Sequence, residues 1–321
     1  MAKKKIKLIS EGSMRDNDPS LTLTLRNRMS SDFTRRYKQI SAAQRSKIID
    51  DNFFGGSLIT NNIVNAVTNQ YSYPSSAAKI AEFMIYIQTM IDAKIFEKII
   101  VFSNVVSPYQ QWTNTYIQTA YKKGLERSRS DLSRMGFGAL LPEASVAAST
   151  YLTMPVHIDT LETVYIRSFE SLKGITAEMS GQISRVLTKG VAEGRSPLEL
   201  ARLISNRIDK IGITRSKRLA RTEIVRAYNV ATINNYEMLN DQISEDLMVE
   251  WYTAADERVR SAHRPWHGEI LTFQQARERI GAINCRCVQI PYIASINEGE
   301  SQNLPDPGWR QRLPDYERRA N

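Results

Sequence analysis

The stretch LETVYIRSFESLKGITAEMSGQISRVL, residues 161–187, predicts the helix around which the rest of the chain is organised. Apolar side chains recur in it every three or four residues, which is the spacing of one face of an α-helix. This face consists of Leu161, Val164, Tyr165, Phe169, Leu172, Ile175, Met179, Ile183, Val186 and Leu187. It extends through about eight helical turns, so several shorter helices can pack on it. The sequence therefore predicts a mainly α-helical protein.

Helical periodicity also covers much of the chain before this stretch. It begins at Ser31 and recurs over residues 63–73, 76–99 and 108–134, with glycine or proline near the breaks. Residues before about 30 are polar and basic, and they predict an arm with little structure of its own. We expect the later segments to form a helical bundle.

Two further helices are predicted after the long one. Ser196 and Pro197 are suited to the cap and the first position of a helix, and Thr214 opens another that continues to about Asn240. Gly212 predicts a turn between these two helices. Because the connections are short, we expect the three helices to pack antiparallel.

The pattern changes after Glu245. Alternating apolar residues at 247–253 and 287–291 predict two strands with a loop-rich segment between them. The expected fold is therefore mainly α, with helical bundle segments followed by a small α+β C-terminal module. Its parts are an extended basic N-terminal arm (1–55), a helical domain (56–154), a module of three helices and α+β structure (155–295) and a C-terminal tail (296–321).

Composition excludes several classes of protein. Apolar residues make up 42% and charged residues 24% of the 321 positions, which is ordinary for a globular chain and unlike collagen or a disordered protein. The most apolar segment, residues 80–102, is interrupted by charges, so we expect no membrane partner. The two cysteines, Cys285 and Cys287, are too close for an unstrained disulfide, which favours a reducing, intracellular origin.

Positive charge is concentrated at the N-terminus. Residues 1–50 hold twelve Lys or Arg against five acidic residues, a net charge of +7 out of +9 for the chain. Such a segment favours a polyanionic partner, because Lys and Arg displace counterions from phosphates, although a solvated terminus without a partner has the same composition. The candidate residues for binding such a polyanion are Lys3, Lys4, Lys5, Lys7, Arg26, Arg28, Arg35, Arg36 and Lys38.

Residues that commonly bind metals gather in one part of the chain. His263, His267, Cys285 and Cys287 supply enough ligands for one tetrahedral zinc, with Asp256 as a further oxygen donor. In the alternative interpretation the cysteines are buried core residues and the histidines fix a loop through hydrogen bonds. Zinc is thus the only cofactor that the sequence suggests.

An enzymatic interpretation uses the same residues. A thiolate beside a histidine is the arrangement of a cysteine hydrolase, which Cys285 or Cys287 near His263 or His267 would provide. The strings typical of nucleobase deaminases and of phosphate-binding loops are absent from the sequence. A metal- or thiol-dependent enzyme acting on nucleic acid or peptide is therefore an alternative to a non-enzymatic protein, and no small-molecule substrate is expected.

Charged residues of the third helix allow two interpretations. Glu223 and Arg226 have the spacing of a surface ion pair, which contributes little to stability. If Arg221 and Glu223 are buried, they are expected to join Asp256, Arg258 and Arg260 in a network that holds the helix to the strands.

Several short strings occur in the order found in one viral family. They are GRSPLELA at 194–201, ARTE at 220–223 with Ala227 and Asn229, Trp251, DERVR at 256–260 with His263 and Gly268, and NCRC at 284–287. Over roughly residues 160–292 this order resembles the Mu F-like minor head proteins of tailed bacteriophages. The family's motif positions correspond here to Arg221, Glu223, Trp251, Asp256, Arg258, Arg260, His263, Gly268, Cys285, Arg286 and Cys287.

The resemblance implies a structural protein of phage head assembly and no enzyme. Such a protein binds the portal vertex or the head interior, is present in few copies, and assists head morphogenesis and DNA packaging or delivery. The implied partners are the portal protein, other head or neck proteins and packaged double-stranded DNA, and the implied location is the virion, after assembly in the host cytoplasm. A head-to-tail connector in the neck is the close alternative.

Overall fold

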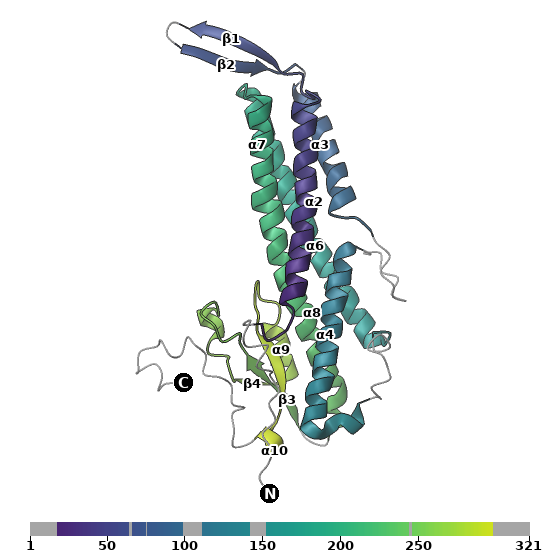
Figure 1. The fold of residues 1–321 in the computed structure, drawn as a ribbon. Coiled ribbons are helices and arrows are strands. Elements are labelled where there is room, and N and C mark those ends of the chain that lie inside the picture. Colours follow the sequence, from purple (N-terminus) through teal and green to yellow (C-terminus); the bar gives the residue numbers. More distant parts are fainter. Residues whose placement is uncertain are drawn as a thin grey trace, which may run out of the picture.

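The computed structural model describes residues 18–63, 66–74, 76–98, 111–141, 152–243 and 246–297. The molecule is elongated: a rod of helices carries a β-hairpin at one end and a small sheet at the other (Figure 1). Within these ranges no helix combines the length and the apolar character needed to span a bilayer.

The predicted long helix is confirmed as α6 (Pro155–Ala192). Its 38 residues correspond to a length of about 57 Å at the helical rise. Leu161, Leu172, Met179 and Ile183 of the apolar face are buried, and α6 packs against α3, α7 and α8. The helix thus forms one side of the rod along its length (Figure 1).

The expected turn at Gly212 is wrong. Helix α7 (Pro197–Arg207), with the predicted Ser196 cap confirmed, continues through the π-helical segment η3 (Ile208–Ile213) into α8 (Thr214–Asn240). Only the connection between α6 and α7 reverses the chain, so the three helices do not form an antiparallel set (Figure 1). Gly212 serves packing instead, because a Cβ there would lie 2.6 Å from the ring of Tyr37.

The first described helix begins earlier than the periodicity predicted. Helix α2 (Leu23–Ile49) starts at Leu23 instead of Ser31, and its Met29, Phe33, Tyr37 and Ile40 are fully buried. It packs against α7 and α8. Residues 23–49, expected within a basic arm, therefore form part of the rod, while residues 1–17 lie outside the described ranges.

The helix predicted over residues 63–73 is wrong. Strands β1 (Ser57–Ile63) and β2 (Ala66–Ser72) form an antiparallel hairpin there. Thr and Asn are frequent in this segment, and both residue types favour a helix less than most others do. The hairpin is fixed to the turn after α6, because Tyr71 N donates to Gly194 O (2.9 Å) and the Tyr73 hydroxyl donates to Arg195 O (2.5 Å).

Helices α3 (Ser76–Lys94) and α4 (Trp112–Leu132) agree with the predicted periodicity. Helix α4 crosses α8 at very short range, since a Cβ at Gly124 would lie 2.2 Å from the carbonyl oxygen of Tyr228. The short helical segments η1 (Ser133–Phe137) and η2 (Gly138–Leu140) follow α4.

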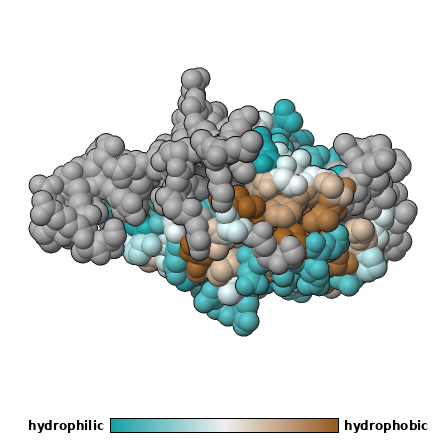
Figure 2. All heavy atoms as spheres, turned by 90° about the horizontal axis from the view of Figure 1, so that it is seen from below, coloured by the Kyte–Doolittle hydropathy of each residue, from teal (hydrophilic) through white to brown (hydrophobic). Residues whose placement is uncertain are grey.

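The predicted strands near the C-terminus are confirmed and joined by a third. The remaining elements are β3 (Leu247–Tyr252), η4 (Ser261–His263), β4 (Ile270–Leu271), α9 (Phe273–Arg279), β5 (Val288–Ile293) and α10 (Ala294–Asn297). The sheet is antiparallel in the order β4-β3-β5. Pro291 is tolerated in β5 because that strand lies at the sheet edge. Seen from below, this end of the molecule shows apolar residues gathered among hydrophilic ones (Figure 2).

Candidate metal centre

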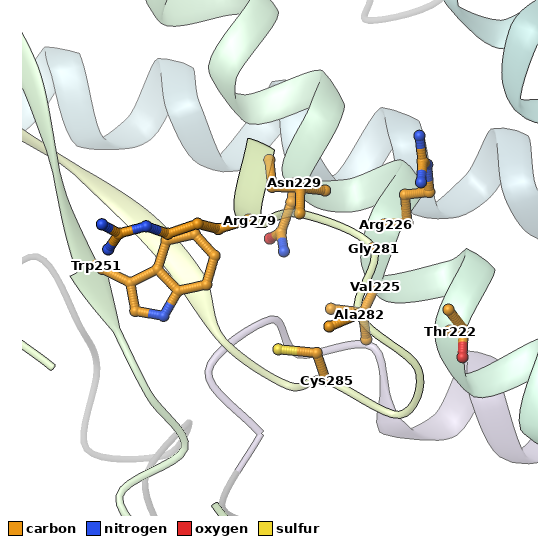
Figure 3. Close-up of a pocket in the computed structure, with 10 residues that line it drawn as sticks. Thr222, Val225, Arg226, Asn229, Trp251, Arg279, Gly281, Ala282 and Cys285 are labelled. Atoms are coloured by element: carbon orange, nitrogen blue, oxygen red, sulfur yellow. The ribbon is translucent and has the colours of Figure 1, made fainter. Parts of the chain in front are cut away.

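One face of α8 holds the loop that carries the two cysteines. Thr222 Oγ1 accepts a hydrogen bond from Asn284 N (3.0 Å), and Asn229 Nδ2 donates to Cys287 O (2.9 Å). Between them Arg226 covers Gly281, where a Cβ would lie 2.4 Å from the guanidinium. Threonine, arginine and asparagine at i, i+4 and i+7 share one helix face, so α8 positions the loop at both ends (Figure 3).

The loop itself uses two left-handed backbone positions. Gly281 has φ +93° and Asn284 φ +56°, and these residue types tolerate that conformation best. A further turn is closed by the hydrogen bond from Cys285 N to Ala282 O (3.0 Å). The Cys285 side chain then points into a crevice beside Trp251 and α8 (Figure 3), while Cys287 is buried at the start of β5.

A second loop, between β3 and β4, supplies a histidine to the same place. His263 ends the short helix η4 and is buried. Its ring stacks on Trp266 with the centroids 4.4 Å apart, and Trp266 in turn packs edge-on against Trp251. The guanidinium of Arg279 lies 4.8 Å from the centroid of Trp266 on its face. The imidazole is therefore held by aromatic packing.

Three predicted ligands converge. The Nδ1 atom of His263 lies 3.5 Å from Cys285 Sγ and 3.8 Å from Cys287 Sγ. The three candidate ligand atoms all lie within 4.8 Å of one another. Both cysteines are free thiols, and their sulfur atoms come from positions two residues apart that the loop bends toward the imidazole.

The two thiols have different acidities. Hydrogen bonds from Cys287 and His263 to the sulfur, opposed by burial, lower the pKa of Cys285 to about 5. The pKa of Cys287 is raised, because its thiol donates to Cys285 and is itself buried. Cys285 therefore favours the thiolate form, which is the form that binds metals and attacks electrophiles.

Asp256, the expected oxygen donor, is used elsewhere. Its carboxylate forms two hydrogen bonds with Arg286, at 2.8 and 2.5 Å, and one with Arg258 Nε at 3.0 Å. Burial opposes ionisation, but these arginines outweigh it and lower the pKa of Asp256. The carboxylate stands apart from the Cys–His cluster and fixes the second loop to Arg286.

His267 does not join the cluster either. Its Nδ1 accepts a hydrogen bond from Thr253 N (3.2 Å) and lies 2.8 Å from Thr253 Oγ1. Its ring packs against Tyr252. The predicted four-residue ligand set is therefore reduced to three among the described residues, because His267 is turned toward the end of β3. Gly268, next to it, has φ +82° and donates its N–H to Trp251 O.

The polar network predicted around Glu223 is divided in two. Glu223 is buried and faces Arg167 of α6, whose Nε lies 3.4 Å away. Burial raises the pKa of Glu223, with Arg167 acting in the opposite direction. Arg221 is exposed, and Arg260 donates instead to the carbonyl of Ile283. Glu223 thus connects α8 to α6, while Asp256 and Arg260 brace the loops.

Several of the residues predicted to bind a polyanion form ion pairs with carboxylates of the same chain. Arg26 is buried and lies 2.6 Å from the carboxylate of Asp18. Arg36 pairs with Glu97, Arg35 with Asp32 and Lys38 with Asp209, at 2.5 to 2.9 Å. Arg28 is exposed. Lys3, Lys4, Lys5 and Lys7 lie outside the described residues. Much of the positive charge on α2 is therefore paired with carboxylates of the same protein.

A cavity of about 200 Å³ opens beside the cluster. His263, Cys285 and Cys287 form part of its wall, and Arg258, Arg260 and Arg286 form another part. These three arginines outnumber the one carboxylate that pairs with them, Asp256, so this wall has a net positive charge. The arrangement can bind a soft cation through the cluster or an anionic group through the arginines.

Two positioning residues were not among the predicted site residues. Thr222 and Asn229 fix the cysteine loop, yet neither residue type by itself indicates a contact with a distant loop. Both residues lie in the strings that carry the family resemblance, and their separation of seven residues on α8 places them on one face. The sequence did not reveal what that face contacts.

A comparison with known protein families points to this part of the chain. The family model described as "Phage Mu protein F like protein" matches residues 181–290, from the last turns of α6 into β5. A stretch of 136 residues is 28% identical to "Uncharacterized protein MJ0329" of Methanocaldococcus jannaschii, covering 42% of this chain and 20% of that protein. The chain thus spans about a fifth of that relative. No solved structure matches.

The matched residues include α7, α8, both loops of the cluster and the face of α8 that holds them. Residues 181–290 of this chain are therefore similar to the phage Mu protein F-like family, and this similarity suggests a phage head-related protein.

Proposed function

We propose that this chain is a minor head protein that binds the portal vertex and assists head morphogenesis and DNA packaging or delivery. The family match over residues 181–290 carries the proposal. The role is structural: a rigid rod presents different surfaces at its two ends, and catalysis is not required of it. The expected location is the virion.

The shape of the molecule supports an assembly role. The hairpin β1–β2 extends beyond the helices at one end, about as far from the C-terminal sheet as the rod allows (Figure 1). Leu58 and Ile59 of β1 are about half exposed, at 52% and 45%. Exposed apolar residues at the end of a rod favour a protein contact, so we assign the hairpin to the portal.

The portal assignment is tested by co-expression. The full chain and the portal protein of the phage that encodes it should co-elute in size-exclusion chromatography. Leu58→Ser with Ile59→Ser should abolish co-elution, whereas Ile85→Ser, an exposed apolar position on α3, should leave it unchanged. Co-elution that survives the hairpin change would refute the assignment, and absence of any complex would refute portal binding.

The basic N-terminus is assigned to packaged DNA. Changing Lys3, Lys4, Lys5 and Lys7 to glutamine should reduce the slope of log affinity against log salt by about 3 to 4 if all four contact phosphates. Lys38→Gln is the matched control, because its ammonium already binds Asp209 at 2.9 Å. The measurement is DNA binding by fluorescence anisotropy at several salt concentrations. Equal slopes for the parent and the fourfold variant would contradict the DNA contact.

The elongated rod also suits a connector on the outside of the neck. Protease treatment of intact particles separates the two positions: a head protein is cleaved only after the particles are opened, and a neck protein is cleaved before.

A further inference from the structure

We propose that His263 Nδ1, Cys285 Sγ and Cys287 Sγ bind one zinc ion, and that the fourth coordination position faces the electropositive cavity. The site goes beyond the assembly role and does not depend on it. It differs from the four-residue set suggested by the sequence, because neither His267 nor Asp256 takes part.

The distances agree with a tetrahedral centre. Zinc–sulfur bonds of about 2.3 Å and zinc–nitrogen bonds of about 2.0 to 2.1 Å place a sulfur and a nitrogen ligand about 3.6 Å apart at the tetrahedral angle. The structure has 3.5 and 3.8 Å between His263 Nδ1 and the two sulfur atoms. The two sulfur–nitrogen separations therefore already match those that a shared ion requires.

Hydrogen bonds from Cys287 and His263 to the Cys285 sulfur leave the approach of Cys287 Sγ to the same imidazole nitrogen unexplained. An imidazole nitrogen has either one proton or one lone pair, so Nδ1 can make one good hydrogen bond. Here two sulfur atoms approach the same nitrogen. A cation placed between the three atoms satisfies all of them at once, because each ligand then directs one lone pair to a common point.

The scaffold holds the ligands without the metal. Asn229 binds the carbonyl of Cys287, Thr222 binds the amide of Asn284, and Trp266 stacks on His263. Such outer contacts fix ligand orientation in metal sites. The ion would join the loop after β3 to the loop before β5, which otherwise meet through Arg286 and Asp256 and through Arg260 and the Ile283 carbonyl.

The fourth position is open to a ligand from outside. Among the described residues no other His, Cys, Asp or Glu joins the three-membered group. The cavity beside it has about 200 Å³ of space and is lined by Arg258, Arg260 and Arg286. Water or a small anion can therefore complete the tetrahedron, and the arginines favour the anion.

Cobalt substitution tests the site on the full chain. The protein is freed of metal under a phosphine reductant and titrated with Co²⁺. We expect the visible absorption of tetrahedral cobalt and a sulfur-to-cobalt charge-transfer band, both saturating at one ion per chain and lost when zinc is added. Octahedral cobalt absorption, or the lack of any stoichiometric binding, would overturn the proposal.

Variants assign the ligands. Cys285→Ser should weaken cobalt binding by about tenfold or more and reduce the charge-transfer band. His267→Gln is the control, because a glutamine oxygen can still accept from Thr253, and it should leave the spectrum unchanged. The reverse pattern would overturn the ligand set. Circular dichroism establishes that each variant is folded.

X-ray absorption spectroscopy of the zinc-loaded parent protein identifies the atoms bound to the metal without the need for a variant. We expect two sulfur ligands and two nitrogen or oxygen ligands at the zinc. In the cobalt-substituted protein, we expect the visible spectrum to shift when azide is added. Three or four sulfur ligands would overturn the proposed set. If azide leaves the cobalt spectrum unchanged, the proposal that the fourth coordination position is open is wrong. If the intact mass shows a Cys285–Cys287 disulfide in the presence of the reductant, the proposed metal site is wrong.

Discussion

Replacing Gly124 by alanine tests the closest helix contact in the rod. The added Cβ would lie 2.2 Å from the Tyr228 carbonyl oxygen and 2.9 Å from Ala231 Cβ. Since backbone cannot move aside as a flexible side chain can, α4 and α8 must separate by about 1 Å, which forfeits a quarter to a half of each dispersion contact across that gap. The Thr232 hydroxyl, 3.3 Å from Gly124 O, also moves away.

The magnitude follows from two opposing effects. Overpacking of this kind costs about 1 to 3 kcal/mol and occasionally more, and the lost contacts place Gly124→Ala at or above the upper end. Alanine regains about 1 kcal/mol of helix propensity. We therefore expect the free energy of unfolding to fall by about 2 kcal/mol, measured by urea denaturation followed by circular dichroism.

A matched control separates packing from propensity. Gly181 is an exposed helical glycine of α6 with nothing within 4 Å of a Cβ, so Gly181→Ala should raise the free energy of unfolding by about 1 kcal/mol. A Gly124→Ala protein as stable as the parent, or stabilised as much as Gly181→Ala, would refute the close crossing of α4 and α8.

Two further predictions concern the C-terminal module. Burial raises the pKa of Glu250 from 4.5 to about 7, so the folded state binds a proton more tightly than the unfolded state and stability falls as the pH rises between these values. The loss of stability is at most about 3 kcal/mol. Glu250→Gln should be more stable than the parent at pH 8 and similar to it at pH 4, as measured by chemical denaturation. The same difference in the free energy of unfolding between variant and parent at both pH values would contradict this prediction. Asn229→Ala should lower the free energy of unfolding by about 1 to 3 kcal/mol, because the buried carbonyl of Cys287 loses its donor; a change below about 0.5 kcal/mol in chemical denaturation would show that the loop does not depend on α8.

Local patterns in the sequence predicted the parts of the fold that depend on local physics. The seam of α6 and the Ser196 cap are set by neighbours within a few residues, and both are present. The alternation that marks β3 and β5 is likewise local. Gly212 was misread because its role depends on Tyr37 of α2, which fills the space that a side chain would occupy.

The sequence predicted which residue types form the candidate site, but it did not predict which individual residues belong to it. Histidine and cysteine near each other in sequence indicated the cluster, and His263, Cys285 and Cys287 do meet. His267 is excluded by Thr253, which no spacing rule anticipates. In the same way, Arg26 looks like a phosphate ligand in sequence, but its pairing with Asp18 is decided by how α2 begins.

Quantitative mass spectrometry of purified, nuclease-treated phage particles tests the assembly role most directly. The account predicts that the chain is present in intact particles at a few copies per portal ring, and that it remains with the portal when the head is disrupted. Its absence from particles that contain their full complement of portal protein would contradict the proposed function.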